Sequence, residues 1–441
     1  MVQASAGFAG AAVGSCLPVW AQTPPDMKLE IAPIVLEIAP RKLIHTFAYN
    51  GRVPGPLIRW PEGKPITIDV LNRTDFPEIV HSHGLWIPSE MDGASEEGSP
   101  MIPPGSQLRY AFTPRPAGFR WYHTHIFAGH DLKRATYSGE FGCFYIEPKN
   151  DPGAYDQEIF LTLHDWNAYM GGSGDSSMEA AYEFGTINDR MLGFSEPLTV
   201  REGQRVLLHI LNASASMIHW LALSGHELIV VAMDGNPVPK PGPIPAIRLA
   251  PAERLDAIVT MNRPGVWILG ETRESFRKAG MGIVVEYANR GGKPVWIEPP
   301  ETIWDYKRFA NSQPTGHQPD KVIPLGFESK FHGAGAFDSW TINGKSFPDT
   351  DTIPLKPGRR YRLQMINSSS DDHPLHLHRH TFEVTKISDV SISGLNKDVV
   401  VVAANTTVEV DFTADNPGAT LFHCHNQTHM DFGFMMLFRY V

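Results

Sequence analysis

One pattern constrains the fold more than any other feature of the sequence: a strand–turn–strand unit occurs three times. Each copy has a glycine in its turn and an asparagine nine residues later, at the end of its second strand. Apolar and polar residues alternate in runs such as ITIDVLN, which is typical of half-buried strands. Because the matching elements come in the same order, they favour three related domains over chance similarity of β-turns. The copies are PLIRWPEGKPITIDVLN (56–72), PLTVREGQRVLLHILN (197–212) and PLKPGRRYRLQMIN (354–367).

Each copy lies within a longer unit of similar organisation. An Asn-Gly or Asn-Asp turn precedes it, a Pro/Gly turn follows it, and the unit closes on an apolar strand: FGCFYIEP, MGIVVEY or FMMLFRYV. We therefore predict an all-β fold of three Greek-key sandwich or barrel domains at 27–150, 151–290 and 325–441. The proline-rich residues 291–324 are predicted to link the second and third domains.

Composition excludes some classes of partner. The net charge is −10 and there is no basic block, so we predict no nucleic-acid partner. No apolar run is long enough to cross a bilayer. Residues 1–26 are predicted to be a leader or disordered tail, because 6–22 resemble an export signal that lacks its charged start; this favours a periplasmic or secreted protein. The three cysteines define no disulfide framework.

The histidines are concentrated in the outer two units. Ten of the 19 fall into four short clusters, whereas the middle unit has no H-x-H pair and no cysteine at the corresponding places. Side chains alternate along a strand, so both imidazoles of an H-x-H pair point to one face. Together with a cysteine between two histidines, this pattern predicts a metal centre, and these ligand types favour copper. The clusters are His81-Ser-His83, His123-Thr-His125, His373-Pro-Leu-His376-Leu-His378 and His423-Cys424-His425-Asn-Gln-Thr-His429.

These four clusters resemble, in order and spacing, the copper-binding signatures of multicopper oxidases: H-x-H, H-x-H, H-P-x-H-x-H and H-C-H-x3-H. The resemblance covers nearly the whole chain after the leader. It implies three cupredoxin domains, four copper ions and a laccase-type oxidase that reduces O2 to water. The trinuclear cluster would lie between the first and third domains. By the resemblance, type 1 copper takes His373, Cys424 and His429; type 2 takes His81 and His376; the type 3 pair takes His83, His123, His125, His378, His423 and His425.

The resemblance also suggests how electrons enter. Cys424 is bonded through the backbone to histidines on both sides, so a ligand of one site is joined to ligands of the other, and His429 is the expected entry point. The family's axial position, ten residues after the cysteine, is Phe434, which cannot coordinate and implies a more oxidising type 1 site. Met435 and Met436 are predicted to pack in the core; the alternative is that a one-residue bulge in the strand brings Met435 to the axial position.

Proton delivery is only partly predicted. Asp92, in the MDG that follows HSHGLW, resembles the acid that family members keep near the type 2 copper; the alternative is a turn aspartate before Gly93. The family often has an acid three or six residues after the cysteine. Here these positions are Gln427 and Met430, so the second proton donor is not identified.

The expected partners are O2 and a small electron donor, a phenol or an aromatic amine, acting on a monomer. An alternative is oxidation of Cu(I), Fe(II) or Mn(II). Cuprous oxidases often carry a methionine-rich insertion, and only the loop 170–178 suggests one. A metal-free scaffold is disfavoured by the complete ligand set, and a copper nitrite reductase by the three-domain organisation.

Overall fold

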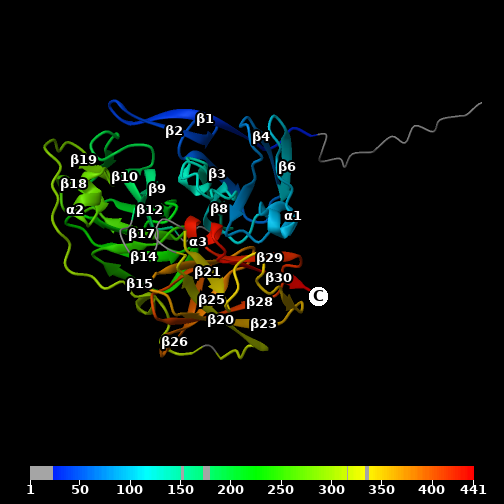
Figure 1. Ribbon diagram of the computed structural model, residues 1–441. Helices are drawn as coiled ribbons and strands as arrows, with labels where there is room; N and C mark the ends of the chain where they lie inside the picture. The colour runs from blue at the N-terminus through cyan, green and yellow to red at the C-terminus, as the bar shows by residue number, and fades with distance from the viewer. Residues whose placement is uncertain (1–22, 150–152, 172–178, 315, 333–336) are drawn as a thin grey trace, which may run out of the picture.

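The computed structural model describes residues 23–149, 153–171, 179–314, 316–332 and 337–441. The predicted leader up to residue 22 and most of the 170–178 loop lie outside this range. The described chain consists mainly of β-strands in six sheets, two for each sequence unit (Figure 1). The all-β prediction is confirmed. Among the described residues, no helix has the length and apolar character needed to cross a membrane.

The first unit packs two four-stranded sheets, in the orders β2-β1-β4-β6 and β3-β8-β7-β5. Three single-turn helices follow β5 or β7: α1 (Ser89–Asp92), η2 (Ser95–Glu97) and η3 (Ala135–Tyr137). The strands are β1 (Met27–Ala39), β2 (Lys42–Tyr49), β3 (Gly55–Pro61), β4 (Ile66–Asn72), β5 (Val80–His83), β6 (Gln107–Phe112), β7 (Gly118–Thr124) and β8 (Phe141–Glu147).

The second unit has a six-stranded sheet, β10-β9-β12-β17-β14-β15, and a five-stranded sheet, β11-β19-β18-β13-β16. Among its described residues, the short helix α2 spans Glu274–Lys278. The strands are β9 (Gln157–Gly171), β10 (Glu179–Ile187), β11 (Leu198–Val200), β12 (Arg205–Asn212), β13 (His219–Leu223), β14 (Leu228–Met233), β15 (Asn236–Ile244), β16 (Ile247–Leu249), β17 (Arg254–Thr260), β18 (Val266–Glu271) and β19 (Gly282–Tyr287).

The third unit repeats the arrangement of the second, with sheets β21-β20-β23-β28-β25-β26 and β22-β30-β29-β24-β27. The short helix α3 (Gln427–Asp431) follows the cysteine-bearing strand. The strands are β20 (Lys321–Lys330), β21 (Ser339–Ile342), β22 (Ile353–Leu355), β23 (Arg360–Asn367), β24 (His373–Leu377), β25 (Phe382–Ile387), β26 (Val390–Lys397), β27 (Val399–Val402), β28 (Thr407–Thr413), β29 (Ala419–Cys424) and β30 (Met435–Tyr440).

The asparagine of the sequence repeat has the same structural role in all three units. Asn72, Asn212 and Asn367 are buried at the ends of β4, β12 and β23. In each, the amide nitrogen donates to a backbone carbonyl four or five residues later and to one across the sandwich, at 2.7–3.1 Å. The side-chain oxygen accepts the backbone N–H two residues later. The asparagine thus fixes the loop that leads into β5, β13 or β24, the strands that begin the histidine clusters in the outer units.

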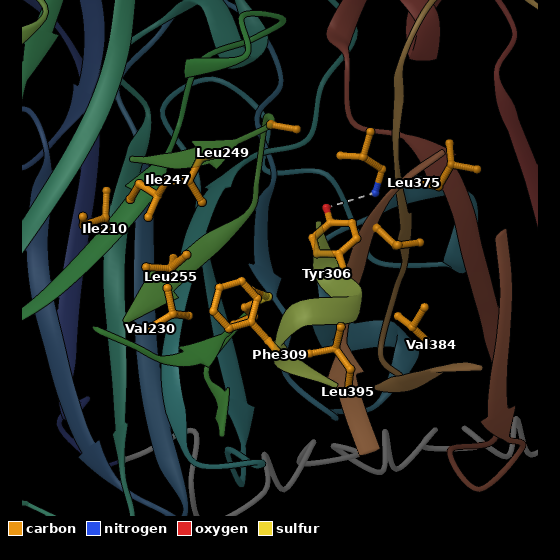
Figure 2. Packing of buried hydrophobic residues seen from close by; sticks show 14 of the residues in the cluster. Ile210, Val230, Ile247, Leu249, Leu255, Tyr306, Phe309, Leu375, Val384 and Leu395 are labelled. Carbon is orange, nitrogen blue, oxygen red and sulfur yellow. Dashed lines mark hydrogen bonds between the residues drawn. The ribbon is translucent and has the colours of Figure 1, made fainter. Parts of the chain in front are cut away.

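The segment between the second and third units also contributes to the core. Its single-turn helix η4 (Tyr306–Phe309) inserts two aromatic side chains between the sandwiches (Figure 2). The Tyr306 hydroxyl donates to Glu253 at 2.5 Å, and the backbone N–H of Val401 donates to the same hydroxyl at 3.4 Å. Phe309 is fully buried between residues such as Val230 and Leu395. This segment therefore helps to fix how the two units dock.

One buried ion cluster joins all three units. Asp398, between β26 and β27, accepts two 2.6 Å hydrogen bonds from Arg254 of β17 and one of 3.1 Å from Arg120 of β7. All three side chains have no exposed surface. Burial alone would raise the pKa of Asp398, but the two guanidinium groups lower it to about 2. Asp398 also contacts His83 Nε2 at 3.1 Å, so this junction lies against the histidine clusters.

Candidate metal centres

Cys424, His373 and His429 converge on one buried point in the third unit. Cys424 Sγ lies 3.5 Å from His429 Nδ1 and 3.8 Å from His373 Nδ1, and the two ring nitrogens are 3.1 Å apart. Strands β24 and β29 are antiparallel neighbours, which brings His373 and Cys424 together. Asn426 then caps α3 by accepting the backbone N–H of Thr428, and this turn returns His429 to the thiol. The three groups can act as ligands of one ion.

Phe434 lies beside this group. Its ring is 4.8 Å from the His373 ring, centroid to centroid, and its carbonyl accepts the Cys424 N–H at 3.1 Å. Met435 packs instead in a separate cluster with Leu421 and Met430, and Met436 packs in the main core. The strand alternation therefore places phenylalanine, and not Met435, on the side of the thiol.

The remaining eight clustered histidines form a single buried group between the first and third units. Strands β5 and β7 place His81 opposite His123, and strands β24 and β29 place His376 opposite His423. Rings stack across the interface: His83 on His376 at 3.8 Å and His81 on His378 at 4.0 Å. The eight histidines, each at most 5% exposed, are His81, His83, His123, His125, His376, His378, His423 and His425.

The ring nitrogens show that this group fits metal ions. In four rings Nδ1 donates to a backbone carbonyl, as His376 Nδ1 does to that of Asp398 at 2.7 Å. Burial lowers the pKa of most of these imidazoles, that of His125 and His376 to about 3, which keeps them in the neutral form that binds metals. Five buried ring nitrogens find no hydrogen-bonding partner in the described part of the chain: His81 Nε2, His83 Nδ1, His123 Nε2, His376 Nε2 and His425 Nε2. Uncharged, unpartnered nitrogens gathered in one place are what metal ligands require.

Asp92 lies where the two units meet. Its Oδ2 is 2.7 Å from His378 Nδ1 and 3.1 Å from His81 Nδ1, and the residue is fully buried. It is therefore more than a turn residue, because it orients one imidazole from each unit. Sequence reasoning missed its neighbour Glu97, whose carboxylate lies 3.4 Å from His378 Nδ1 and accepts the Leu421 N–H at 2.6 Å. Burial and the nearby Asp92 raise the pKa of Glu97 well above its usual range.

A second group that the sequence did not reveal lies beside His429. Glu179, at the start of β10, comes within 3.0 Å of His429 Nε2 and keeps 39% of its side chain exposed. Burial raises the pKa of Asp371, and the charges of Glu179 and Asp338 act in the same direction. Glu179 and Asp371 therefore lie near His429, and Asp338 lies near Asp371; His429 itself is only 1% exposed, so Glu179 is the group beside it that reaches the surface. These carboxyl groups belong to different units and to no recognised motif, so no local sequence signal could have assembled them.

Comparison with known proteins identifies the family. Three sequence-family models, each describing a multicopper oxidase domain, match residues 36–151, 158–284 and 322–441. The chain belongs to the multicopper oxidase family. The matched residues cover most of the chain, and each model covers one of the three sandwiches. The predicted cupredoxin architecture and oxidoreductase class are thereby confirmed.

Relatives of this multicopper oxidase differ in their named roles. It is 28% identical to multicopper oxidase MmcO of Mycobacterium tuberculosis, over 90% of this chain and 84% of that protein. It is 25% identical to the iron transport multicopper oxidase FET3 of Gibberella zeae, over 88% of this chain and 72% of that protein. The crystal structure of a multicopper oxidase from Pseudomonas thermotolerans superposes with a TM-score of 0.74 at 25% identity, covering 95% of this chain and 100% of that one.

Proposed function

We propose that this protein couples the one-electron oxidation of a small donor to the four-electron reduction of O2 to water. The observation that supports this most strongly is the placement of Cys424 between His423 and His425: the thiol faces one cluster of ligands and its two neighbours face the other. Copper bound at these sites supplies the one-electron transfers and the reduction of O2. The chain's own residues determine where electrons and protons enter.

The ligand assignment that we propose follows the convergence of the side chains. His373, Cys424 and His429 would hold the type 1 ion, beside the ring of Phe434, which cannot coordinate. His81 and His376 would hold the type 2 ion: the Nε2 atom of each has no partner among the described residues, and the two residues belong, with His378, to one group of potential ligands. Six histidines then hold the type 3 pair and bring the total to four copper ions: His83, His123, His125, His378, His423 and His425.

Asp92 and Glu179 have distinct parts in this proposal. Asp92 accepts a hydrogen bond from His378 Nδ1 with its carboxylate and one from His81 Nδ1 with its backbone carbonyl, holds both rings in place and is positioned to pass a proton to the cluster side. Glu179 lies at the electron-entry edge of His429. A phenol or an aromatic amine becomes strongly acidic when it loses an electron, so a carboxylate at this edge can take up its proton. We therefore favour these donors.

A second class of donor is supported by the same surface. The carboxyl groups of Glu179, Asp338 and Asp371 near His429 suit a cation, and hard carboxylate oxygens are suitable ligands for Fe(II) or Mn(II). The relative named for iron transport keeps this option open. One carboxylate is sufficient for proton uptake from a phenol, whereas attraction of a metal ion uses all three.

Two variants distinguish the donor classes. Glu179→Gln should lower kcat/KM for phenols, and the loss should shrink at high pH, where solvent base takes the proton. Asp371→Asn should leave phenol oxidation unchanged and lower kcat/KM for Fe(II) if metal ions are the donors. Steady-state O2 consumption with both donor types measures these rates. If neither variant affects the oxidation of any donor, the proposed electron entry at the Glu179–His429 edge is wrong.

Export to the periplasm or the medium, predicted from residues 6–22, can be checked by cell fractionation.

A further inference from the structure

Two glutamates are buried together behind the strand that carries His123. Glu78 is fully buried, and Glu140 is 1% exposed. Each carboxyl group is among the neighbours that shift the pKa of the other, so the two lie close together. The Oε1 atom of each has no hydrogen-bonding partner among the residues that the structure describes. Two buried carboxyl groups this close cannot both be ionised at modest cost, so the pair retains a proton where isolated glutamates would not.

Each carboxyl group is held in place from its other side. Thr124 Oγ1 donates to Glu78 Oε2 at 2.8 Å, and the backbone N–H of Ile79 donates to the same oxygen at 3.3 Å. Ser138 Oγ donates to Glu140 Oε2 at 3.0 Å. These hydrogen bonds thus hold both carboxyl groups in fixed positions.

Thr124 connects this pair to the histidine group. It stands between His123 and His125 in the chain and lines a cavity of about 10 Å³. That volume is close to the space that one water molecule needs. Four clustered histidines line the same cavity: His123, His125, His423 and His425. Thr124 therefore links Glu78, which its hydroxyl contacts, to the space that its residue lines together with the histidines.

The other side of the pair lies close to solvent. Arg134 acts on both carboxyl groups electrostatically, and it lines an open surface hollow of about 500 Å³ together with Asp75 and Asp131. The Arg134 guanidinium stacks over the Phe76 ring at 3.5 Å. Arg134 thus acts on the pair and also lines a hollow that is open to solvent.

The environment tunes the pair to neutral pH. Burial raises the pKa of Glu78 to about 7, although Thr124 and Arg134 act against the increase. Burial, followed by the neighbouring Glu78, raises the pKa of Glu140 well above its usual range. The other titratable groups that face the pair are Tyr49 and Tyr110, and burial raises the pKa of both, so they stay neutral. A group with a pKa near the working pH can both give up and regain a proton during turnover.

We propose that the Glu78–Glu140 pair stores protons and delivers them through Thr124 to the site of O2 reduction. This inference rests on the proposed oxidase function. Each O2 takes up four electrons from the donor and four protons, and gives two water molecules. A proton that leaves the pair through the Thr124 hydroxyl is replaced from solvent on the Arg134 side. The pair supplies acid groups to a chain that has Gln427 and Met430 where relatives often carry acids.

The proton store is tested without copper. Infrared difference spectra of the metal-free protein across neutral pH should show the carbonyl stretch of a protonated carboxylic acid that disappears as pH rises. Glu140→Gln and Glu78→Gln should each remove or shift that band, and both replacements keep the shape of the side chain. Glu147→Gln, at the solvent-facing end of strand β8, which begins directly after Glu140, is the matched control and should leave the band unchanged. A band that survives in both variants overturns the proton store.

Delivery is tested in the copper-loaded protein. With saturating donor, Glu140→Gln and Thr124→Val should lower kcat at least about tenfold, raise the solvent deuterium isotope effect and change the pH profile. The anaerobic bleaching of the blue band by donor should keep its rate, because electron entry does not involve the pair. Thr124→Val should also keep the infrared band. Full turnover in both variants of an active wild type overturns the relay alone, whereas a wild type that consumes no O2 overturns the oxidase proposal itself.

Discussion

Replacing Asp398 with asparagine tests whether the three units are held together by their shared ion cluster. Asparagine preserves the size and shape of the side chain and removes only its charge. In the native protein the Asp398 carboxylate accepts three hydrogen bonds from Arg254 and Arg120, both fully buried. In the variant, two guanidinium groups from different units face an amide that also presents N–H donors.

The expected cost follows from burial. Removing one partner of a buried ion pair leaves an uncompensated charge and typically costs about 3–5 kcal/mol. Asp234 lies 3.7 Å from Arg254 and offsets part of this charge, so we expect the lower end, about 3 kcal/mol. The pKa of Asp398 is lowered to about 2, so its contribution is present above the pKa of an unfolded aspartate and is lost as pH falls toward 2.

Urea unfolding of the metal-free protein, followed by tryptophan fluorescence, measures this loss. The first transition is the relevant one, since a three-domain protein need not unfold in a single step. Asp320→Asn is the control, because Asp320 pairs with Arg359 at the surface at 2.7 Å; its transition should coincide with that of the wild type. If Asp398→Asn unfolds at the same urea concentration as this control, the junction does not hold the units together.

Three further predictions concern single side chains. Phe434→Met should lower the type 1 potential, because a thioether stabilises Cu(II) where the present ring cannot coordinate; redox titration of the blue band measures it, and an unchanged potential rejects the axial assignment. Asp92→Asn should slow O2 reduction and alter its pH profile while anaerobic bleaching persists; a normal steady-state profile would exclude a proton role. Burial alone would lower the pKa of His219, but the neighbouring carboxylates of Asp165 and Glu271 raise it to about 9. Its stabilising effect is complete below the pKa of an unfolded histidine and is lost as pH rises through 9, so His219→Gln should flatten that decline in urea titrations. An unaltered dependence of stability on pH in this variant would contradict the role of His219.

The repeat made the architecture predictable because each of its residues has a local structural role. The glycines occupy turns with positive φ, at +76° for Gly63 and Gly358 and +81° for Gly203, where other residues are strained. The buried asparagines fix the loops that follow. Docking of the units was not predictable in the same way. The segment 291–324 was expected only to connect two domains, and its proline content gives no hint that Tyr306 and Phe309 fill the space between them.

The candidate site likewise has a part that local sequence patterns predict and a part that depends on tertiary contacts. Histidines spaced two apart on a strand share one face, so the ligand clusters could be predicted from the sequence. The structure brings these clusters together. Carboxyl groups carry no such spacing. Glu179 reaches His429 across 250 positions of sequence, and Glu78 meets Thr124 across 46. Only Asp92 was found in advance, because it follows a histidine pair closely in the chain. Groups that orient ligands or supply protons depend on tertiary contacts.

The most direct test of the central proposal is to load the purified protein with copper, count the metal and record the visible spectrum through one redox cycle. We predict four copper ions per chain and an intense blue band that bleaches when a donor is added without air and returns with O2. Cys424→Ser should abolish the band while the histidine group still binds copper. A folded, fully loaded wild type that stays colourless would contradict the type 1 site at Cys424 and with it the proposed oxidase function.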